Sequence, residues 1–160
     1  MNNISRLIAI AMIFALGVGT AAVAGSTPDP VMGTWNLDLA KSKFTPGPAP
    51  KSQTRTYAET ADGIALTYSG VATDGSSISG KSTFKYDGKD YAITGSPDFD
   101  TLSLKRLKGN TIRSVQKKNG KVIGSTVRKI SADGKVLTLT SNGKDAKGAG
   151  YHNVMVFDKQ

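Results

Sequence analysis

Cysteine is absent from the sequence, and histidine occurs once, at His152. Without cysteine the chain can form no disulfide, no thiolate metal site and no lipid-modified cysteine anchor. A single histidine excludes multi-histidine metal sites and the cysteine–histidine nucleophile pairs of hydrolases. Nothing places the members of a Ser-His-Asp triad near one another. We therefore expect no enzymatic activity, no metal and no cofactor, and His152 is expected at the surface.

The first 24 residues differ from the rest of the chain. One arginine, Arg6, precedes a continuous apolar run, and Ala22 to Ala24 supply the small residues of a signal peptidase site. We interpret residues 1–24 as a signal peptide, which leaves residues 25–160 as one domain in the periplasm or outside the cell. An uncleaved membrane anchor is the alternative, because this apolar run is long enough to span a bilayer when tilted. After cleavage no integral membrane segment is expected.

Large apolar residues are scarce, since only 7% of the chain is aromatic, and the formal net charge is +9. The lysines are scattered. No basic helical stripe or platform of aromatic and basic residues occurs, so nucleic acid is not an expected partner. A soluble monomer with a cationic surface is the simplest expectation.

Short alternating runs separated by turn residues predict an all-β meander. Asp-Gly occurs at Asp62, Asp74, Asp87 and Asp133, and Asn-Gly at Asn119 and Asn142, and such pairs suit tight hairpins. The predicted strands are 33–38, 51–59, 64–72, 77–86, 90–95, 101–107, 111–118, 121–130, 135–141 and 150–157. Residues 39–50 contain Pro46, Pro48 and Pro50, and are predicted to be an arm or lid across one mouth of the fold.

A meander of this length would expose two unpaired edges unless it closed on itself. The sequence therefore predicts an antiparallel up-and-down β-barrel of about 8–10 strands, whose first strand pairs with the last. A two-sheet sandwich is the alternative, although it needs longer crossover connections than these hairpins provide.

Alternation along each strand indicates which residues face inward. If the lysines face solvent, Arg106 and Arg128 lie inside the barrel or at its rim, and Tyr68, Tyr86 and Tyr91 face the same side. An interior of aliphatic, aromatic, small and cationic residues favours a partly wet cavity over a dry core. Two guanidinium groups would suit a carboxylate or phosphate head group. The alternative is that each arginine closes a barrel end or reaches solvent.

The segment Gly33-Thr34-Trp35 resembles the Gly-x-Trp signature that opens the first strand of lipocalins and other calycins. Together with the Leu39–Ser52 arm, Lys85–Gly95 and Ser103–Leu107, it makes residues 25–160 similar to small exported bacterial lipocalin-like proteins of uncharacterised function. The resemblance implies that Trp35 plugs one barrel end, beneath a basic residue that would be Lys159 or Arg128. It also offers haem ligation as a second interpretation of His152.

The sequence departs from that family in several places. It lacks the Thr-Asp-Tyr motif, a C-terminal helix, the helical lid of fatty-acid-binding proteins and their Arg-x-Tyr ligand pair. The resemblance therefore implies a barrel and a cavity without naming a ligand.

Two functions follow from these observations. The first is binding of a small hydrophobic or amphipathic ligand, anionic in one version, by Arg106, Arg128, Tyr68, Tyr86 and Tyr91. The alternative is a non-catalytic envelope module with a filled barrel, whose lysines contact an anionic surface. The lysines of that surface would include Lys85, Lys105, Lys117, Lys118 and Lys121.

Overall fold

The computed structural model describes residues 28–145 and 147–160, so the predicted signal peptide lies outside the described residues. The strands are β1 (Gly33–Thr45), β2 (Ser52–Thr60), β3 (Gly63–Val71), β4 (Ser77–Phe84), β5 (Asp87–Ala92), β6 (Thr101–Arg106), β7 (Thr111–Lys118), β8 (Lys121–Ile130), β9 (Val136–Lys144) and β10 (Gly150–Lys159). No helix long and apolar enough to cross a membrane occurs in this part of the chain.

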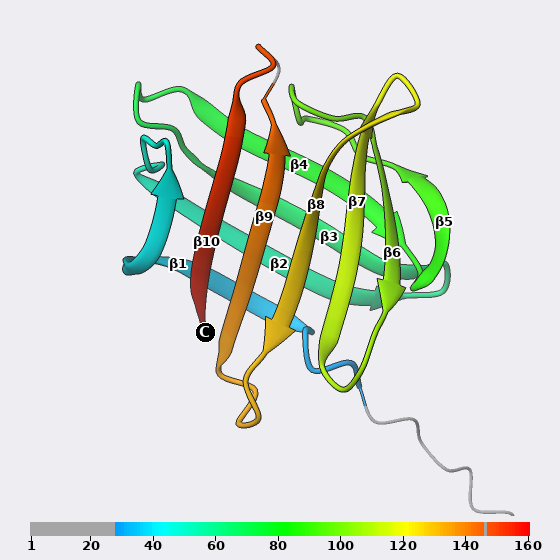
Figure 1. Cartoon of the computed structure of the whole chain (residues 1–160). Coiled ribbons are helices and arrows are strands. Elements are labelled where there is room, and N and C mark those ends of the chain that lie inside the picture. The colour runs from blue at the N-terminus through cyan, green and yellow to red at the C-terminus, as the bar shows by residue number, and fades with distance from the viewer. Residues whose placement is uncertain (1–27, 146) are drawn as a thin grey trace, which may run out of the picture.

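The ten strands form one antiparallel sheet in the order β4-β3-β2-β1-β10-β9-β8-β7-β6-β5. β6 to β10 lie across β1 to β4, so that the sheet wraps around an interior (Figure 1). The first strand pairs with the last, with Trp35 opposite Lys159 and Leu37 opposite Phe157. The antiparallel up-and-down barrel expected from the sequence is thereby confirmed.

The sheet closes between β4 and β5 through a short contact rather than a full ladder. Lys81 and Thr94 form one antiparallel bridge, with N···O distances of 2.9 and 3.0 Å between their backbones. The hydroxyl of Ser82 also donates to the carbonyl of Ala92 at 2.8 Å. Both edges of the sheet are thus held together, which limits the unpaired backbone open to other chains.

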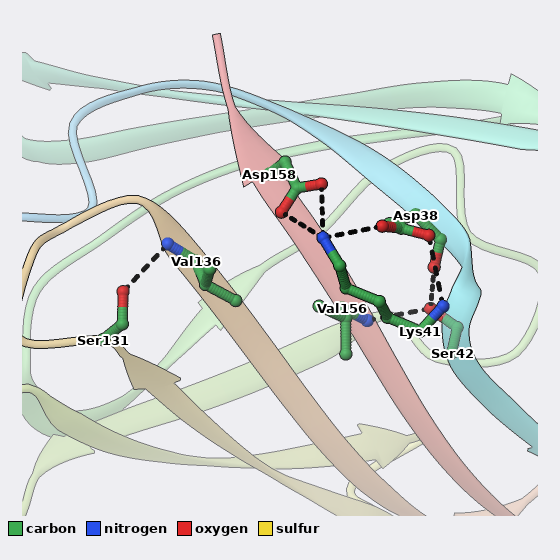
Figure 2. Close-up of polar contacts among 7 residues, drawn as sticks. All are labelled: Asp38, Lys41, Ser42, Ser131, Val136, Val156 and Asp158. Atoms are coloured by element: carbon green, nitrogen blue, oxygen red, sulfur yellow. Dashed lines mark hydrogen bonds and ion pairs between the residues drawn. The ribbon is translucent and has the colours of Figure 1, made fainter.

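β1 contradicts the expectation that residues 39–50 lack a strand, because it continues to Thr45 across a bulge. The register shifts between Asp38 and Lys43. Within the bulge the Ser42 hydroxyl donates to the Asp38 carbonyl at 2.6 Å and accepts from the Val156 amide at 2.9 Å. That side chain replaces a missing ladder bond and lets the strand turn a corner (Figure 2). Only residues 46–51 lie between β1 and β2.

Lys41 spans the same bulge on the outside of the barrel. Its ammonium lies 2.8 Å from Asp38 and 3.0 Å from Asp158 on β10 (Figure 2). The same figure shows the Val136 amide donating to the Ser131 hydroxyl, at 2.9 Å, in the β8–β9 turn. Short polar side chains therefore complete the hydrogen bonding where the regular ladder ends.

Most predicted Asp-Gly and Asn-Gly turns have the positive φ angle at glycine that such turns need. Asn119 is a non-glycine residue with positive φ, 51°, and Gly120 after it has φ 74°. Asn142-Gly143 is a correction, since both residues lie inside β9. Gly143 pairs with Gly124 of β8, and a Cβ on Gly143 would lie 2.8 Å from the Tyr151 hydroxyl. Here glycine allows a close approach and makes no turn.

A group of fully buried apolar residues lies at one end of the barrel, where the chain enters β1. Trp35, Leu137, Phe157 and Val31 are fully buried there. The Trp35 indole donates from Nε1 to the Val31 carbonyl at 2.7 Å, so its one polar atom is satisfied. This closed end supplies a dry core, and the interior beyond it is differently built.

Candidate ligand-binding cavity

A cavity of about 560 Å³ occupies the barrel interior above the closed end. Its rim includes Ala72 and Ser76 after β3, the Gly95–Phe99 segment between β5 and β6, and Asp145 after β9. These segments lie at the barrel end opposite Trp35. A volume of this size is within the range of small-molecule sites.

One side of the cavity is apolar. Its residues come mainly from β3, β4, β6, β7 and the segment after β5, and are Leu66, Ile78, Phe84, Ile93, Phe99, Leu102, Leu104 and Ile112. Inward residues alternate with solvent-facing ones along each strand, as Leu102 and Leu104 do on β6. This side can bury the hydrocarbon part of a ligand.

The other side, across β7 to β9, is polar. The Gln116 amide donates from Nε2 to the Ser114 and Thr126 hydroxyls, each at 3.0 Å. Thr126 and Ser141 lie 2.8 Å apart and share a further hydrogen bond. All four side chains line the cavity. The carbonyl oxygen of the Gln116 amide is buried without a protein partner.

Arg128 on β8 lies inside the barrel, on the cavity wall, with 6% of its surface exposed. Its guanidinium packs over the rings of Tyr57 and Tyr86, at 5.4 and 5.2 Å from their centroids. One Nη donates to the Tyr86 hydroxyl, while Nε has no protein partner. No carboxylate of the described residues lies within ion-pair distance of it, although the Asp29 carboxylate is close enough to act on its charge. A buried guanidinium in this state favours an anion beside it.

Arg55 on β2 is the second cationic group of the cavity wall, and the sequence analysis did not select it. It donates from Nε to the Tyr57 hydroxyl at 3.3 Å and from Nη1 to Gln53 at 3.2 Å. Its guanidinium lies 5.0 Å from the Tyr68 ring centroid. Burial raises the pKa of the Tyr57 phenol, but Arg55 and Arg128 outweigh this and the net pKa is lowered. The cavity around Tyr57 therefore has a positive potential.

Arg106 lies outside the cavity wall, although the sequence placed it with Arg128 inside or at the rim. It is exposed near the closed end, where one Nη lies 2.5 Å from Asp29. The guanidinium packs 4.6 Å from the centroid of the Tyr86 ring. Arg106 thus fixes the segment that precedes β1, as in the alternative that an arginine closes a barrel end.

The three selected tyrosines have different surroundings. Tyr68 lines the cavity, lying over Gly80, whereas Tyr86 and Tyr91 are outside the cavity wall. Burial raises the pKa of Tyr86 to about 12, against the opposing effect of Arg128. The Tyr91 hydroxyl donates to exposed Asp87 at 2.9 Å. The structure therefore brings Arg128 and Tyr68 to one cavity and leaves Arg106, Tyr86 and Tyr91 outside it; ligand contact by any of them stays a prediction.

The Gly-x-Trp segment sits at the closed end, beneath Lys159. The Lys159 ammonium lies 5.1 Å from the centroid of the Trp35 ring and 3.4 Å from the Pro30 carbonyl. Gly33 has φ 118°, and a Cβ there would approach Cε of Lys159 to 3.0 Å. Glycine is thus needed both for its backbone conformation and for the space under the lysine. Of the two candidates for the covering residue, the geometry selects Lys159 over Arg128.

His152 lies on the outer side of β10, where Nδ1 is 2.6 Å from the Asn142 side-chain oxygen. Its side chain is exposed. Within residues 28–145 and 147–160, no group of three or more histidine, aspartate or glutamate residues could hold a metal ion. The position fits the expectation of a surface histidine, and it gives the haem alternative no support.

The polar cavity residues that the sequence did not single out include, besides Arg55, the hydrogen-bonded group of Gln116, Ser114, Thr126 and Ser141. The signal was present, because Ser114 and Gln116 alternate with outward residues on β7, as Gln53, Arg55 and Tyr57 do on β2. Polar residues at regular two-residue spacing were a further indication of a wet interior.

Comparison with known proteins gives little beyond the architecture. No protein-family model matches the chain, and no curated protein matches it. Among solved structures, one that is similar is zebrafish ileal bile acid-binding protein complexed with cholic acid. The identity is 14%, the TM-score is 0.49, and the match covers 82% of this chain and 99% of that chain. This likeness concerns the barrel and implies nothing about the ligand of this chain.

Proposed function

We propose that this protein is a non-enzymatic carrier that binds a small amphipathic acid inside its barrel. The observation that supports this most is Arg128, a buried guanidinium on a cavity wall, with an unpartnered Nε and no carboxylate paired to it among the described residues. A bound anion would compensate the cost of burying this charge. The apolar wall of Leu66, Leu102 and Leu104 would receive the hydrocarbon part.

Arg55 strengthens the case for an anion rather than a neutral ligand. Arg55 and Arg128 both lower the pKa of Tyr57, so the charges of both guanidinium groups act on the same part of the cavity. Two guanidinium groups sharing one cavity repel each other in a low-dielectric interior. A carboxylate or phosphate within reach of both would remove that repulsion and accept charge-assisted hydrogen bonds.

The proposal also includes a compartment, which is inferred from the sequence. The apolar run and the alanines at 22–24 support export to the periplasm or beyond the cell, in a bacterium. A carrier without cysteine is suited to an oxidising compartment because no thiol needs protection. We expect the exported protein to be a monomer.

The alternative, a cationic module that contacts an anionic envelope surface, requires a filled barrel. A cavity of about 560 Å³ disfavours that version. Lys117 is also paired with Asp90 at 2.7 Å, and Lys118 donates to the Pro97 carbonyl, so two lysines of the predicted surface have other partners. Surface attraction would remain compatible with a carrier as a secondary property.

The experiment is calorimetric titration of dodecanoate and uncharged dodecanol into wild type, Arg128→Met and Arg55→Met. Wild type should bind dodecanoate more tightly than dodecanol, and each variant should lose about tenfold or more of the dodecanoate affinity, the effect of one lost charge-assisted hydrogen bond. Arg113→Met is the matched control, because Arg113 is exposed on the outside of β7.

Two results would contradict the proposal. One is equal affinity for the acid and the alcohol in wild type. The other is an equal loss in the Arg113→Met control, which would attribute the effect to net charge rather than to the cavity.

A further inference from the structure

Two buried polar atoms of the cavity wall have no partner within residues 28–145 and 147–160, and they need opposite kinds of ligand group. Arg128 Nε carries a hydrogen and needs an acceptor, whereas Gln116 Oε1 needs a donor. The two residues are 6% and 7% exposed, and both line the cavity. Leaving either atom unsatisfied costs free energy, so both are candidates for contact with a ligand.

Gln116 Oε1 is held in place by the rest of its amide. Both hydrogens of Nε2 are used, one by Ser114 and one by Thr126, at 3.0 Å each. The amide therefore cannot turn its oxygen toward another part of the wall without losing these bonds. A hydroxyl is the ligand group best suited to this position, because it can donate to the oxygen while remaining uncharged.

Strand register places Arg128 and Gln116 two rows apart on the same wall. Ile112, Arg128 and Leu139 form one row across β7, β8 and β9, Ser114, Thr126 and Ser141 form the next, and Gln116 lies in the third, opposite Gly124. Neighbouring rows are about 7 Å apart, because they are separated by two residues along a strand. The Gln116 amide bonds to Ser114 and Thr126, so its head lies at the middle row. A single ligand can therefore reach both unsatisfied atoms, with its acid at Arg128 and a hydroxyl at Gln116.

From this arrangement we infer that the ligand is a hydroxylated amphipathic acid. Its anionic group lies against Arg128, its hydroxyl donates to Gln116 Oε1, and its hydrocarbon faces the apolar wall that includes Leu102 and Leu104. The inference rests on the proposed function, since it assumes that an amphipathic acid enters the cavity, and it adds which acids are preferred.

The test uses dodecanoate and its 3-, 6- and 12-hydroxy derivatives as probes, titrated calorimetrically into the wild-type mature chain. At least one hydroxy isomer should bind about tenfold more tightly than dodecanoate, as expected when a buried acceptor gains its hydrogen bond. The matching keto acid has an oxygen at the same carbon but no hydrogen to donate. It should show none of the gain.

Gln116→Leu and Gln116→Met should each bind the hydroxy isomer no more tightly than they bind dodecanoate. Ser125→Ala is the control, because Ser125 is next to Thr126 on β8 and so faces the other side of the sheet. It should retain the preference. Thermal unfolding of each variant checks that it is folded, and the comparison of hydroxy and keto acids on wild type needs no variant.

The outcomes separate this inference from the proposed function. Dodecanoate binding without a gain for any hydroxy isomer overturns the inference and leaves the proposed function intact. An equal gain for the keto acid, or a preference that survives both Gln116 variants, also overturns it. Failure of every acid to bind overturns the proposed function together with the inference.

Discussion

The two ends of this barrel are built from the same alternating strands but are filled in different ways. At the closed end Trp35, Leu137 and Phe157 are fully buried, and the indole Nε1 has its partner in Val31. In the cavity, Gln116 and Arg128 are also buried, but each keeps a polar atom without a partner among the described residues. At the closed end the indole nitrogen is hydrogen-bonded within the chain, whereas the cavity wall leaves two polar atoms for a ligand to satisfy.

This difference assigns stability and binding to separate regions. Apolar area removed from water stabilises the folded chain, and the closed end supplies such area through Trp35, Leu137 and Phe157. Buried polar atoms without hydrogen-bond partners lower the free energy of unfolding, so the cavity wall makes the folded chain less stable than a fully satisfied wall would. The contrast teaches that a substitution should act on unfolding at one end and on ligand affinity at the other. Each of the following predictions tests that separation.

The largest expected effect is that of Trp35→Ala. Removing the indole leaves a void in packed surroundings and strands the Val31 carbonyl, so the free energy of unfolding should fall by about 3–5 kcal/mol. Met155→Ala is the comparison on the cavity side, where the space is already open, and it should cost about 1–2 kcal/mol, less than a typical fully buried methionine. Urea unfolding followed by circular dichroism measures both.

Equal losses for the two variants would break the comparison, because they would mean that the cavity wall is as tightly packed as the closed end. A loss within experimental error for Trp35→Ala would show that the indole does not plug the barrel.

How much of this could be predicted depends on how local the signal is. Strand alternation and hairpin turns are local, and they were enough to predict ten antiparallel strands and the pairing of Trp35 with the last strand. The bulge in β1 depends on the Ser42 hydroxyl reaching the Val156 amide, a contact between residues 114 apart in the chain. The sequence of residues 39–45 alone does not predict that contact.

The candidate site was predicted only in part for a similar reason. Arg128 was found because alternation along its strand marks the inner face. Arg106 was selected with it, but the end of β6 lies beside Asp29, which precedes β1, so Arg106 lies outside the cavity wall. The preference of Arg106 for that carboxylate is a long-range ion pair. Arg55 was missed because β2 alternates between polar residue types on both faces, so hydropathy does not mark its inner side.

A smaller effect is expected for Tyr86→Phe, and it depends on pH. The pKa of Tyr86 is raised from 10.0 to about 12, so the folded chain holds this proton more tightly than the unfolded chain does. Stability from this source is complete below the unfolded pKa and is lost as pH rises from about 10 toward about 12. Wild type should therefore lose more stability over this interval than Tyr86→Phe, in urea unfolding at stepped pH.

Tyr57→Phe gives the opposite sign, which sharpens this prediction. The pKa of Tyr57 is lowered in the folded chain. Its ionisation therefore adds stability as pH rises through the folded pKa toward 10.0. Tyr57→Phe removes the phenol group and should remove that gain. Parallel pH profiles for wild type and both variants would contradict the assignment of positive potential to the cavity around Tyr57.

The smallest expected effect is that of Lys159→Met at the closed end. The ammonium over the Trp35 ring contributes a cation–π contact of about 0.5–1 kcal/mol at an exposed site, and methionine keeps the apolar cover while removing the charge. Lys129→Met, on the outside of β8, is the control and should leave unfolding unchanged. Dodecanoate affinity should be unaltered in both variants, since neither lysine lines the cavity. A loss of dodecanoate affinity in Lys159→Met, but not in Lys129→Met, would mean that the closed end and the cavity are coupled through Trp35. Stability and binding would then not be assigned to separate regions of the barrel.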